Sequence, residues 1–251
     1  MTERSTQPPE TPPQPDQITF NVRLIDERVR EGLRLEDLLL LDRSSIAPWR
    51  PPACFKHQQN LPGYFWMSQT RQLIFYESRL EMTVLKRIDF EEKVAFVVPQ
   101  PFELHFRVGA SKRRHVPDFL VWRVNADPLL VNVKPLAYMD KARNRDSFAA
   151  CQAIGQRIKL QHRVYNEPES LFLANVRWLA GFRREPILIP QAAPPLMDRL
   201  SNGPLPFGEW IRGIGEEALV LPAAFHLLWK RRVEFKQSVL LGSDSLVWCG
   251  K

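Results

Sequence analysis

Apolar and polar residues alternate along the middle of the chain in a way that predicts strands. Every second position of 102–108 is apolar, with charged or polar residues between, and this period of two is typical of a strand with one buried face. We expect the chain to turn at a glycine, return along 115–122, turn again and continue along 129–134. Three strands joined by short turns predict an antiparallel meander.

Other segments carry apolar residues at helical spacing. In the second of them, Leu80, Val84 and Ile88 repeat every four residues while charged side chains occupy the other face, which is typical of an amphipathic helix. The predicted helices are 27–42, 72–89, 140–161 and 169–180; further strand signals lie at 18–25, 94–98 and 164–165. This order of elements predicts a mixed α/β fold.

The last third of the chain has a different pattern. Short helix signals at three places are separated by glycine or proline, and two strand signals flank a Gly-Ser-Asp turn. Three short helices followed by a two-stranded wing are the layout of a winged helix. The predicted helices are 194–201, 206–214 and 219–232, and the predicted hairpin strands are 233–240 and 246–248.

The first 17 residues include five prolines and, beyond the initiator methionine, no large apolar side chain. Such a segment buries too little surface to offset the entropy of ordering it. We therefore predict a disordered tail over 1–17, a larger domain over 18–185 and a winged-helix-like domain over 186–251.

Composition narrows the choice of partner and compartment. The chain has 251 residues, with 35 Lys and Arg against 28 Asp and Glu, so its net charge is +7. This excess favours a polyanion such as nucleic acid, or an anionic membrane surface. Three widely spaced cysteines form no disulfide framework, no export signal is visible, and the most apolar stretch, 219–229, is too short to cross a bilayer. We expect a cytoplasmic protein with no membrane partner.

Candidate chemistry is concentrated between residues 81 and 134. Asp118 follows a proline at the start of an apolar strand, and Lys134 closes the next one. Side chains alternate across a strand, so Asn132 and Lys134 are expected on one face. Adjacent hairpin strands would bring both close to Asp118, and Glu81 on the preceding helix could complete the cluster.

This combination of residues suits metal-dependent cleavage of a phosphodiester. Carboxylates hold hard cations such as Mg²⁺ through oxygen, and the metal polarises the phosphate and lowers the pKa of a bound water. A neighbouring lysine can orient that water or neutralise charge in the transition state.

The residues resemble the PD-(D/E)xK nuclease superfamily and, within it, the TnsA-like heteromeric transposase endonucleases. The resemblance covers roughly 60–185, and it implies a restriction-endonuclease-like mixed sheet flanked by helices. Its motifs are Asn60 to Trp66, Tyr76 to Glu81, Gln100 to Phe102, His115 to Phe119, Val131 to Pro135, Cys151, Val164 to Tyr165 and Asn175 to Arg183.

The resemblance also implies roles for individual residues. Glu81 matches the helix-borne acid, Asp118 the metal-bridging acid and Lys134 the catalytic lysine. Asn132 stands where the superfamily usually has an acid, so the site would hold one less negative charge, and Val133 could offer its backbone carbonyl. The expected cofactor is Mg²⁺, with Mn²⁺ as a substitute. The expected partners are double-stranded DNA, a DDE-type transposase subunit and an ATPase regulator docked on the C-terminal domain.

Ordinary structural explanations remain open for the same residues. Ser78 and Glu81 have the spacing of a helix capping box, and Lys134 before a proline can simply end a strand. The chain could also be a nuclease-derived scaffold that binds DNA or a partner without cutting, which Asn132 favours. A third alternative is a stand-alone defence or repair nuclease.

Several basic runs are candidates for DNA contact. Lys112, Arg113, Arg114 and His115 precede the Pro-Asp pair and lie next to the expected site. The segments 141–163 and 230–232 are also basic. A run of charge is often only a solvated face, so both interpretations stay open for each patch.

Overall fold

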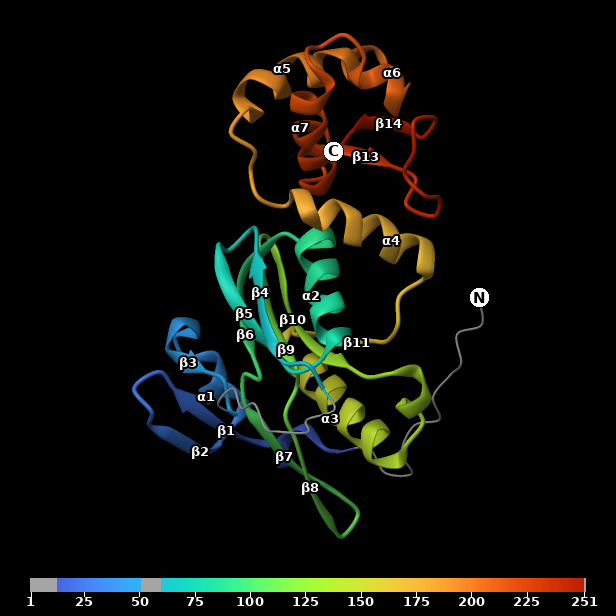
Figure 1. Cartoon of the computed structure of the whole chain (residues 1–251). Helices are drawn as coiled ribbons and strands as arrows, with labels where there is room; N and C mark the ends of the chain where they lie inside the picture. Colours follow the sequence, from blue (N-terminus) through green and yellow to red (C-terminus); the bar gives the residue numbers. More distant parts are fainter. Residues whose placement is uncertain (1–12, 51–59, 251) are drawn as a thin grey trace. The chain divides into compact units, whose positions relative to one another are not determined.

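The computed structural model describes residues 13–50 and 60–250, which divide into two compact units (Figure 1). The first unit comprises the described residues up to 85 together with 92–167, and the second comprises 86–91 together with 168–250. Helix α2 (Arg79–Glu91) contributes to both units. The sequence-based boundary at 185 falls later than this division, because helix α4 (Ser170–Leu179) groups with the second unit.

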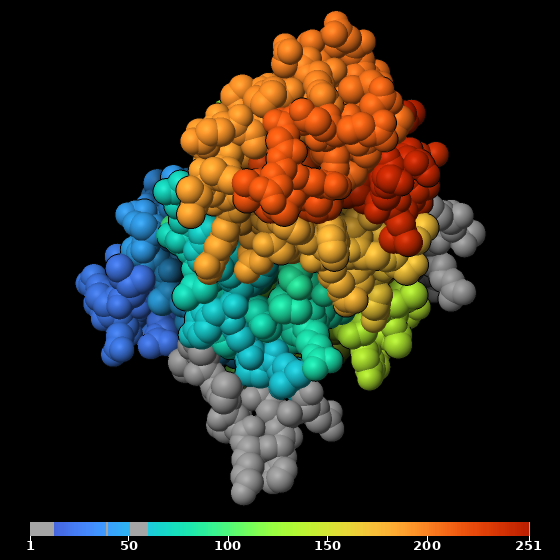
Figure 2. All heavy atoms as spheres, turned by 45° about the horizontal axis from the view of Figure 1, so that its top comes forward, coloured from blue at the N-terminus to red at the C-terminus, as the bar shows by residue number. Residues whose placement is uncertain are grey.

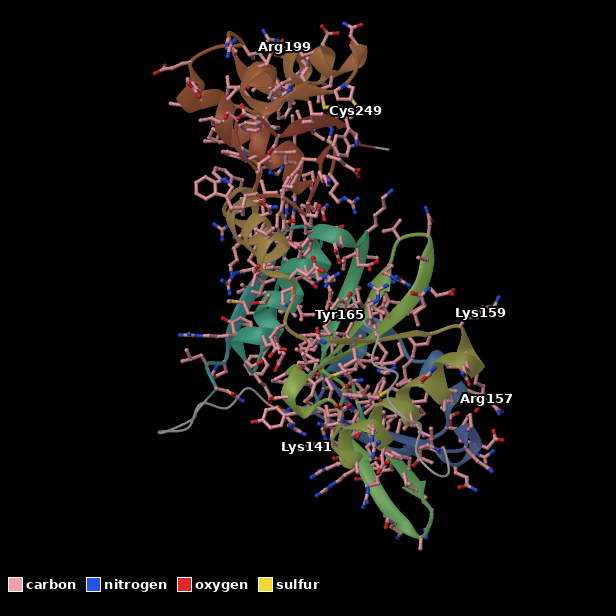
Figure 3. All side chains as sticks on the ribbon, turned by 90° about the vertical axis from the view of Figure 1, so that its right-hand side faces the viewer. Lys141, Arg157, Lys159, Tyr165, Arg199 and Cys249 are labelled. Carbon is pink, nitrogen blue, oxygen red and sulfur yellow. The ribbon has the colours of Figure 1, made fainter. Side chains whose placement is uncertain are left out.

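Most of the predicted disordered tail lies outside the described residues, as does Cys54. The described part of the tail contains a short 3-10 helix, η1 (Pro15–Gln17). Asp16 forms an ion pair with Arg157, which Figure 3 labels near the end of helix α3 (Ala142–Ile158). This end of the tail therefore has a defined structure.

The first unit is built on a four-stranded sheet in the order β11-β10-β9-β6. Its strands are β6 (Val94–Pro99), β9 (Phe119–Arg123), β10 (Ala126–Val133) and β11 (Gln161–Tyr165). β6, β9 and β10 are antiparallel, whereas β11 runs parallel to β10. A parallel neighbour needs a crossover, and α3 supplies it. The helix predicted over 140–161 is confirmed with slightly shorter bounds, and it buries Ala150, Cys151 and Ile154 in one core with Leu130.

A second sheet in this unit has the order β2-β1-β7-β8, with β3 (Ile46–Ala47) beside β1. Its other strands are β1 (Thr19–Leu24), β2 (Val29–Leu33), β7 (Glu103–Val108) and β8 (Ser111–His115). β7 and β8 form a hairpin that projects from the unit (Figure 1). The predicted meander is wrong in its first strand, because 102–108 pairs with β1 and β8 rather than with β9. The single strand predicted over 115–122 is also divided, since residues 116–118 carry the chain from one sheet to the other.

Two predicted helices are wrong at their N-terminal ends. Most of 27–42 is the hairpin strand β2 followed by the short helix α1 (Leu35–Leu39), and Gly32 there has a φ of +64°, which a helix does not accept. Residues 72–76 form β5 (Gln72–Tyr76), which pairs with β4 (Gly63–Met67). α2 therefore begins only at Arg79.

The second unit contains helices and a small sheet of its own. Its elements are α4, α5 (Ile189–Arg199), α6 (Phe207–Ile211), α7 (Glu217–Trp229), β12 (Leu205–Pro206), β13 (Val233–Phe235) and β14 (Leu246–Cys249). The predicted C-terminal hairpin is confirmed, with a shorter first strand and a second strand that extends one residue further, and β12 adds a third strand to it. Trp210, Trp229 and Leu196 are nearly inaccessible in its core. Figure 2 shows α5 to α7 in orange and the C-terminal strands in red.

The described residues therefore form a mixed α/β protein with several antiparallel pairings flanked by helices. Short 3-10 turns connect the elements: η2 (Arg43–Ser45), η3 (Leu136–Tyr138), η4 (Ala180–Phe182) and η5 (Leu200–Asn202). No described helix combines the length and apolarity needed to span a bilayer.

Candidate functional site

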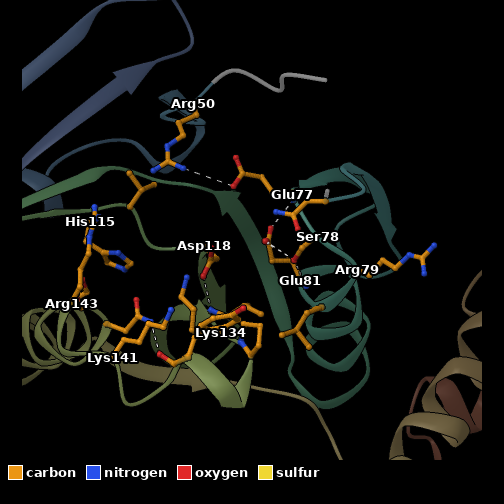
Figure 4. A pocket seen from close by; sticks show the side chains of 18 of the residues that line it. Arg50, Glu77, Ser78, Arg79, Glu81, His115, Asp118, Lys134, Lys141 and Arg143 are labelled. Carbon is orange, nitrogen blue, oxygen red and sulfur yellow. Dashed lines mark hydrogen bonds and ion pairs between the residues drawn. The ribbon is translucent and has the colours of Figure 1, made fainter. Parts of the chain in front are cut away.

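A polar pocket of about 970 Å³ lies in the first unit where β10 ends and α2 and α3 begin. In Figure 4, Glu81 lies on one side of the pocket and His115 on the other, with Asp118 and Lys134 between them. The charged and titratable residues that line it are Arg50, Glu77, Arg79, Glu81, Arg114, His115, Asp118, Lys134, Lys141 and Arg143.

Asp118 is held beside the end of β10 by two backbone hydrogen bonds. It directly precedes β9, and its N–H donates to the carbonyl of Val131 at 3.0 Å. The N–H of Val133 donates to Oδ2 of Asp118 at 2.6 Å. The predicted closeness of Asp118 to β10 is confirmed, and it follows from the antiparallel pairing of β9 with β10.

Glu81 lies in the first turn of α2 and takes part in the capping box that its spacing from Ser78 indicates. The N–H of Glu77 donates to Oε2 of Glu81 at 2.7 Å, and the hydroxyl of Ser78 donates to Oε1 at 2.8 Å. The N–H of Glu81 in turn donates to the hydroxyl of Ser78 at 3.2 Å. The serine half of the capping box is therefore present, whereas the Glu81 carboxylate binds the N–H of Glu77 in place of that of Ser78; these bonds fix a carboxylate that also lines the pocket.

The two carboxylates raise each other's energy when both are ionised. Burial is the largest cause that raises the pKa of Asp118, to about 8, and the charge of Glu81 raises it further. The pKa of Glu81 is also raised, chiefly by burial and further by the charge of Glu77, although the donors on Glu77 and Ser78 oppose the shift. A buried pair of like charges is a common feature of functional sites, and a cation between them would relieve the repulsion.

Lys134 supplies a positive charge to this pair. It follows the last residue of β10, and its N–H donates to the carbonyl of Tyr165 at 2.8 Å. Its side chain lines the pocket, and its charge lowers the pKa of both Asp118 and Glu81. The structure thus brings together the three side chains on which the sequence-based hypothesis depends.

Asn132 occupies a different environment. Its side chain is 1% exposed and does not line the pocket. Oδ1 lies 2.5 Å from Nε2 of His115, and Nδ2 lies 2.9 Å from Nε2 of His162. Of the predicted metal ligands, Val133 does lie at the pocket, beside Asp118.

Glu81 and Asp118 are the carboxylates of this pocket that could hold Mg²⁺ through oxygen, and Val133 lines the same pocket beside Asp118. Among residues 13–50 and 60–250, no group of three or more His, Cys, Asp or Glu side chains is arranged to hold a metal ion. Mg²⁺ does not require such a group, because it is usually bound through one or two carboxylates together with water and substrate phosphate oxygens. Asn132 is outside this set of pocket residues.

The predicted DNA-binding residues point in two directions. Arg114 and His115 line the pocket, whereas Nε of Arg113 lies 3.6 Å from Oδ2 of Asp146 on α3. Lys112 is exposed and stands opposite Arg107 in the β7–β8 ladder. Since side chains alternate, Lys112 and Arg114 share one face of the hairpin and Arg113 and His115 share the other, so the pocket receives one side chain from each face.

Two charged residues of this region could not be found from sequence patterns. Arg50 lines the pocket and lies 4.0 Å from Glu77, although it is distant from α2 along the chain. Arg107 becomes a neighbour of Lys112 only through the strand pairing. By contrast, Lys141 and Arg143 belong to the basic segment 141–163, of which Figure 3 labels Lys141, Arg157 and Lys159 along α3. In the second unit, Arg231 of the basic run 230–232 pairs with Glu234 at 2.9 Å.

Compared with known proteins, the chain matches no family model. No curated protein matches its sequence either.

Proposed function

We propose that this protein is a Mg²⁺-dependent DNA endonuclease, similar to the TnsA-like subunits that cut DNA at the ends of mobile elements. The observation that carries the proposal is the convergence of Glu81, Asp118 and Lys134 on one polar pocket. These residues come from three separate segments, and further positively charged side chains line the pocket around them.

The order of elements in the first unit supports the proposed restriction-endonuclease-like core. α2 is followed by the antiparallel strands β6, β9 and β10, then by α3 and the parallel strand β11. The β7–β8 hairpin is an insertion in this order. In the second unit, α5 to α7 followed by the β13–β14 hairpin agree with a winged-helix-like domain.

In the proposed reaction the chain's own residues bind and orient a phosphodiester. Mg²⁺ bound by Glu81 and Asp118 would polarise the phosphate and lower the pKa of a water. Lys134 places an ammonium beside both carboxylates, where it stabilises negative charge that develops on the phosphate oxygens. Arg114, Lys141 and Arg143 at the pocket wall attract the flanking backbone phosphates.

The exposed face of the β7–β8 hairpin has positive charges that oppose each other, an arrangement that is unfavourable for folding but suits DNA binding. Arg107 stands directly opposite Lys112, whereas His105, which stands opposite Arg114, contacts the carboxylate of Glu103 at 2.7 Å. Like charges facing each other across a ladder destabilise it. A phosphate backbone lying along this face would remove that cost, and the face leads toward the pocket because Arg114 is in its lining.

The double variant Arg107→Gln/Lys112→Gln should therefore bind DNA with a weaker salt dependence. If each cation contacts one phosphate, the slope of log K against log salt decreases by about 1.8 in magnitude, since each phosphate contact contributes about 0.9. Fluorescence anisotropy with a duplex at several salt concentrations measures the slope. The control Arg30→Gln/Lys93→Gln removes the same charge from exposed positions of the first unit, and an equal decrease there would contradict a specific contact.

The proposed partners are a DDE-type transposase subunit and an ATPase regulator, and the proposed location is the cytoplasm. The alternative is a non-catalytic scaffold that binds DNA or a partner. The engagement of Glu81 in a helix cap and the burial of Asn132 favour this alternative. A stand-alone defence or repair nuclease would use the same pocket, and neighbouring genes would distinguish it.

Nicking of supercoiled plasmid tests the proposal. The wild-type protein, alone or with a transposase partner, should nick DNA in Mg²⁺ or Mn²⁺ and not in EDTA. Asp118→Asn should be inactive under the same conditions. Nicking that persists in EDTA or in this variant would reject the assignment of the site. DNA binding without any nicking by the wild type would favour the scaffold.

A further inference from the structure

The strongest feature that the proposed function leaves unexplained is a buried polar cluster behind the pocket. The carboxamide of Asn132 lies between two imidazoles, those of His115 on β8 and His162 on β11, and near the thiol of Cys151 on α3. β8 belongs to one sheet and β11 to the other. One side chain thus connects elements of both sheets and a helix.

The hydrogen-bonding capacity of this carboxamide is almost fully used. Oδ1 accepts from Nε2 of His115 at 2.5 Å. The two N–H groups of Nδ2 are directed to Nε2 of His162 at 2.9 Å and to Sγ of Cys151 at 3.4 Å. The amide oxygen thus already accepts a hydrogen bond from His115, and Asn132 is outside the residues that line the pocket, so this oxygen is not offered to a metal there.

The two imidazoles face different surfaces. His115 lines the site pocket together with Asp118, whereas His162 lines a second, smaller pocket formed with Phe148 and Gln152. Since an amide oxygen can only accept and its nitrogen can only donate, Nε2 of His115 carries a proton and Nε2 of His162 carries a lone pair. His115 is then left with a lone pair on Nδ1, so the only hydrogen-bonding role remaining to its imidazole is that of an acceptor.

We infer that Asn132 is a positioning residue: its carboxamide fixes the imidazole of His115 at the wall of the site pocket and does not ligate the metal. This inference rests on the proposed function and reverses the role that the family resemblance gives to Asn132. The carboxamide selects the tautomer of His115, in the way that a hydrogen-bond partner of the second ring nitrogen commonly does. His115 can then accept a hydrogen bond from water or a hydroxyl group in the pocket.

Burial supports this arrangement. It lowers the pKa of His115 to about 4, against the opposing effect of Asn132, and the positive charges of Lys134, Arg50 and Arg143 lower it further. The pKa of His162 is also lowered to about 4 by burial, with a smaller effect of His115. Both rings are therefore neutral at pH 7, which a tautomer-selecting amide requires.

The variant Asn132→Asp separates the two roles of this residue. A carboxylate offers only acceptors, so the proton on Nε2 of His115 stays, whereas His162 must turn to the Nε2–H tautomer or become charged. Long-range ¹⁵N–¹H NMR of the histidine rings measures the tautomer of each ring directly. In the wild type, neither ring should change its tautomer when Mg²⁺ is added. Asn125→Asp, in an exposed turn, adds the same charge and should leave both rings unchanged.

Mn²⁺ binding, followed by electron paramagnetic resonance, provides the second measurement. Asn132→Asp should change the Mn²⁺ dissociation constant by less than about threefold, because the new carboxylate is buried behind the pocket lining, between His115 and His162, and adds no ligand to the metal. If Asn132 were a ligand, the extra charge in the ligand set would tighten binding by about tenfold or more. That tightening, or a tautomer change of His115 on adding Mg²⁺ to the wild type, would overturn the inference.

The failure of the proposed function would give a different result. In that case neither the wild type nor Asp118→Asn would bind Mn²⁺ measurably, while the tautomers of His115 and His162 would still report on Asn132. A wild-type His115 that carries its proton on Nδ1 would reject the positioning role whatever the metal result.

Discussion

Asp118→Asn should stabilise the metal-free protein at pH 8 while it removes metal-dependent cleavage. Burial and the charge of Glu81 raise the pKa of Asp118 from its ordinary value of 3.8 to about 8. Between these two pH values the folded state binds more protons than the unfolded state, so the free energy of unfolding decreases as pH rises. Asparagine never ionises, and its side-chain oxygen can still accept the N–H of Val133. The rise of this pKa from 3.8 to about 8 corresponds to a gain of at most about 5 kcal/mol at pH 8.

Amide hydrogen exchange in EDTA at pH 5 and pH 8 measures this effect in the first unit alone. The amides of β9 and β10 report on its opening, independently of the second unit. The control Asp127→Asn changes an exposed carboxyl group on β10 and should leave the pH dependence as in the wild type. A variant Asp118→Asn that is less protected than the wild type at pH 8 would contradict the proposed repulsion.

Asp118→Asn is expected to raise the stability of the metal-free protein and to abolish cleavage. This combination distinguishes a functional carboxylate from a structural one. A carboxyl group that serves folding is stabilised in its charged form, and its replacement weakens the protein. Asp118 and Glu81 instead share a pocket in which burial raises the pKa of both, the charge of Glu81 raises the pKa of Asp118 further, and the charge of Glu77 raises the pKa of Glu81. Any ligand that binds only the folded state adds to its stability, so Mg²⁺ should stabilise the wild type and not Asp118→Asn.

Much of this site could be predicted from the sequence because its elements are local or adjacent. The Pro117-Asp118 pair marks the start of a strand, and hairpin pairing of β9 with β10 carries Asp118 to the end of β10. Ser78 and Glu81 mark the beginning of α2 by their spacing. Each of these signals depends on only a few consecutive residues.

The position of Asn132 could not be predicted in the same way. Alternation places Asn132 and Lys134 on one face only while both belong to the same strand. β10 ends at Val133, and Lys134 continues into the 3-10 turn η3. The side chain of Lys134 therefore lies at the pocket, whereas that of Asn132 is buried against α3, near Cys151.

Long-range pairing explains the remaining differences. β7 joins β1 across a large sequence separation, and neither strand indicates the other by its own periodicity. The segment 72–76 is apolar enough for a helix, yet it pairs with β4 as a strand. Strand preference is set largely by such neighbours, so the membership of the two sheets became visible only in the folded structure.

Lys134→Gln should reduce the rate of Mg²⁺-dependent cleavage by about a hundredfold, because removing a group aimed at developing charge typically costs two to three orders of magnitude. DNA affinity should change little, since Arg79, Arg114, Lys141 and Arg143 still line the pocket. Single-turnover cleavage measures the rate, and duplex binding in Ca²⁺ measures the affinity.

Lys141→Gln is the matched variant for this comparison. Nζ of Lys141 lies 4.4 Å from the ring centre of Tyr138, at the pocket but in a different cation–π environment. It carries the same charge as Lys134, but its ammonium lies against Tyr138, whereas the charge of Lys134 acts on Asp118 and Glu81. Its loss should therefore raise KM and leave the single-turnover rate at saturating DNA nearly unchanged. Equal rate losses in the two variants would mean that Lys134 contributes only to the general positive charge of the pocket, and the proposed catalytic role of this lysine would then be wrong.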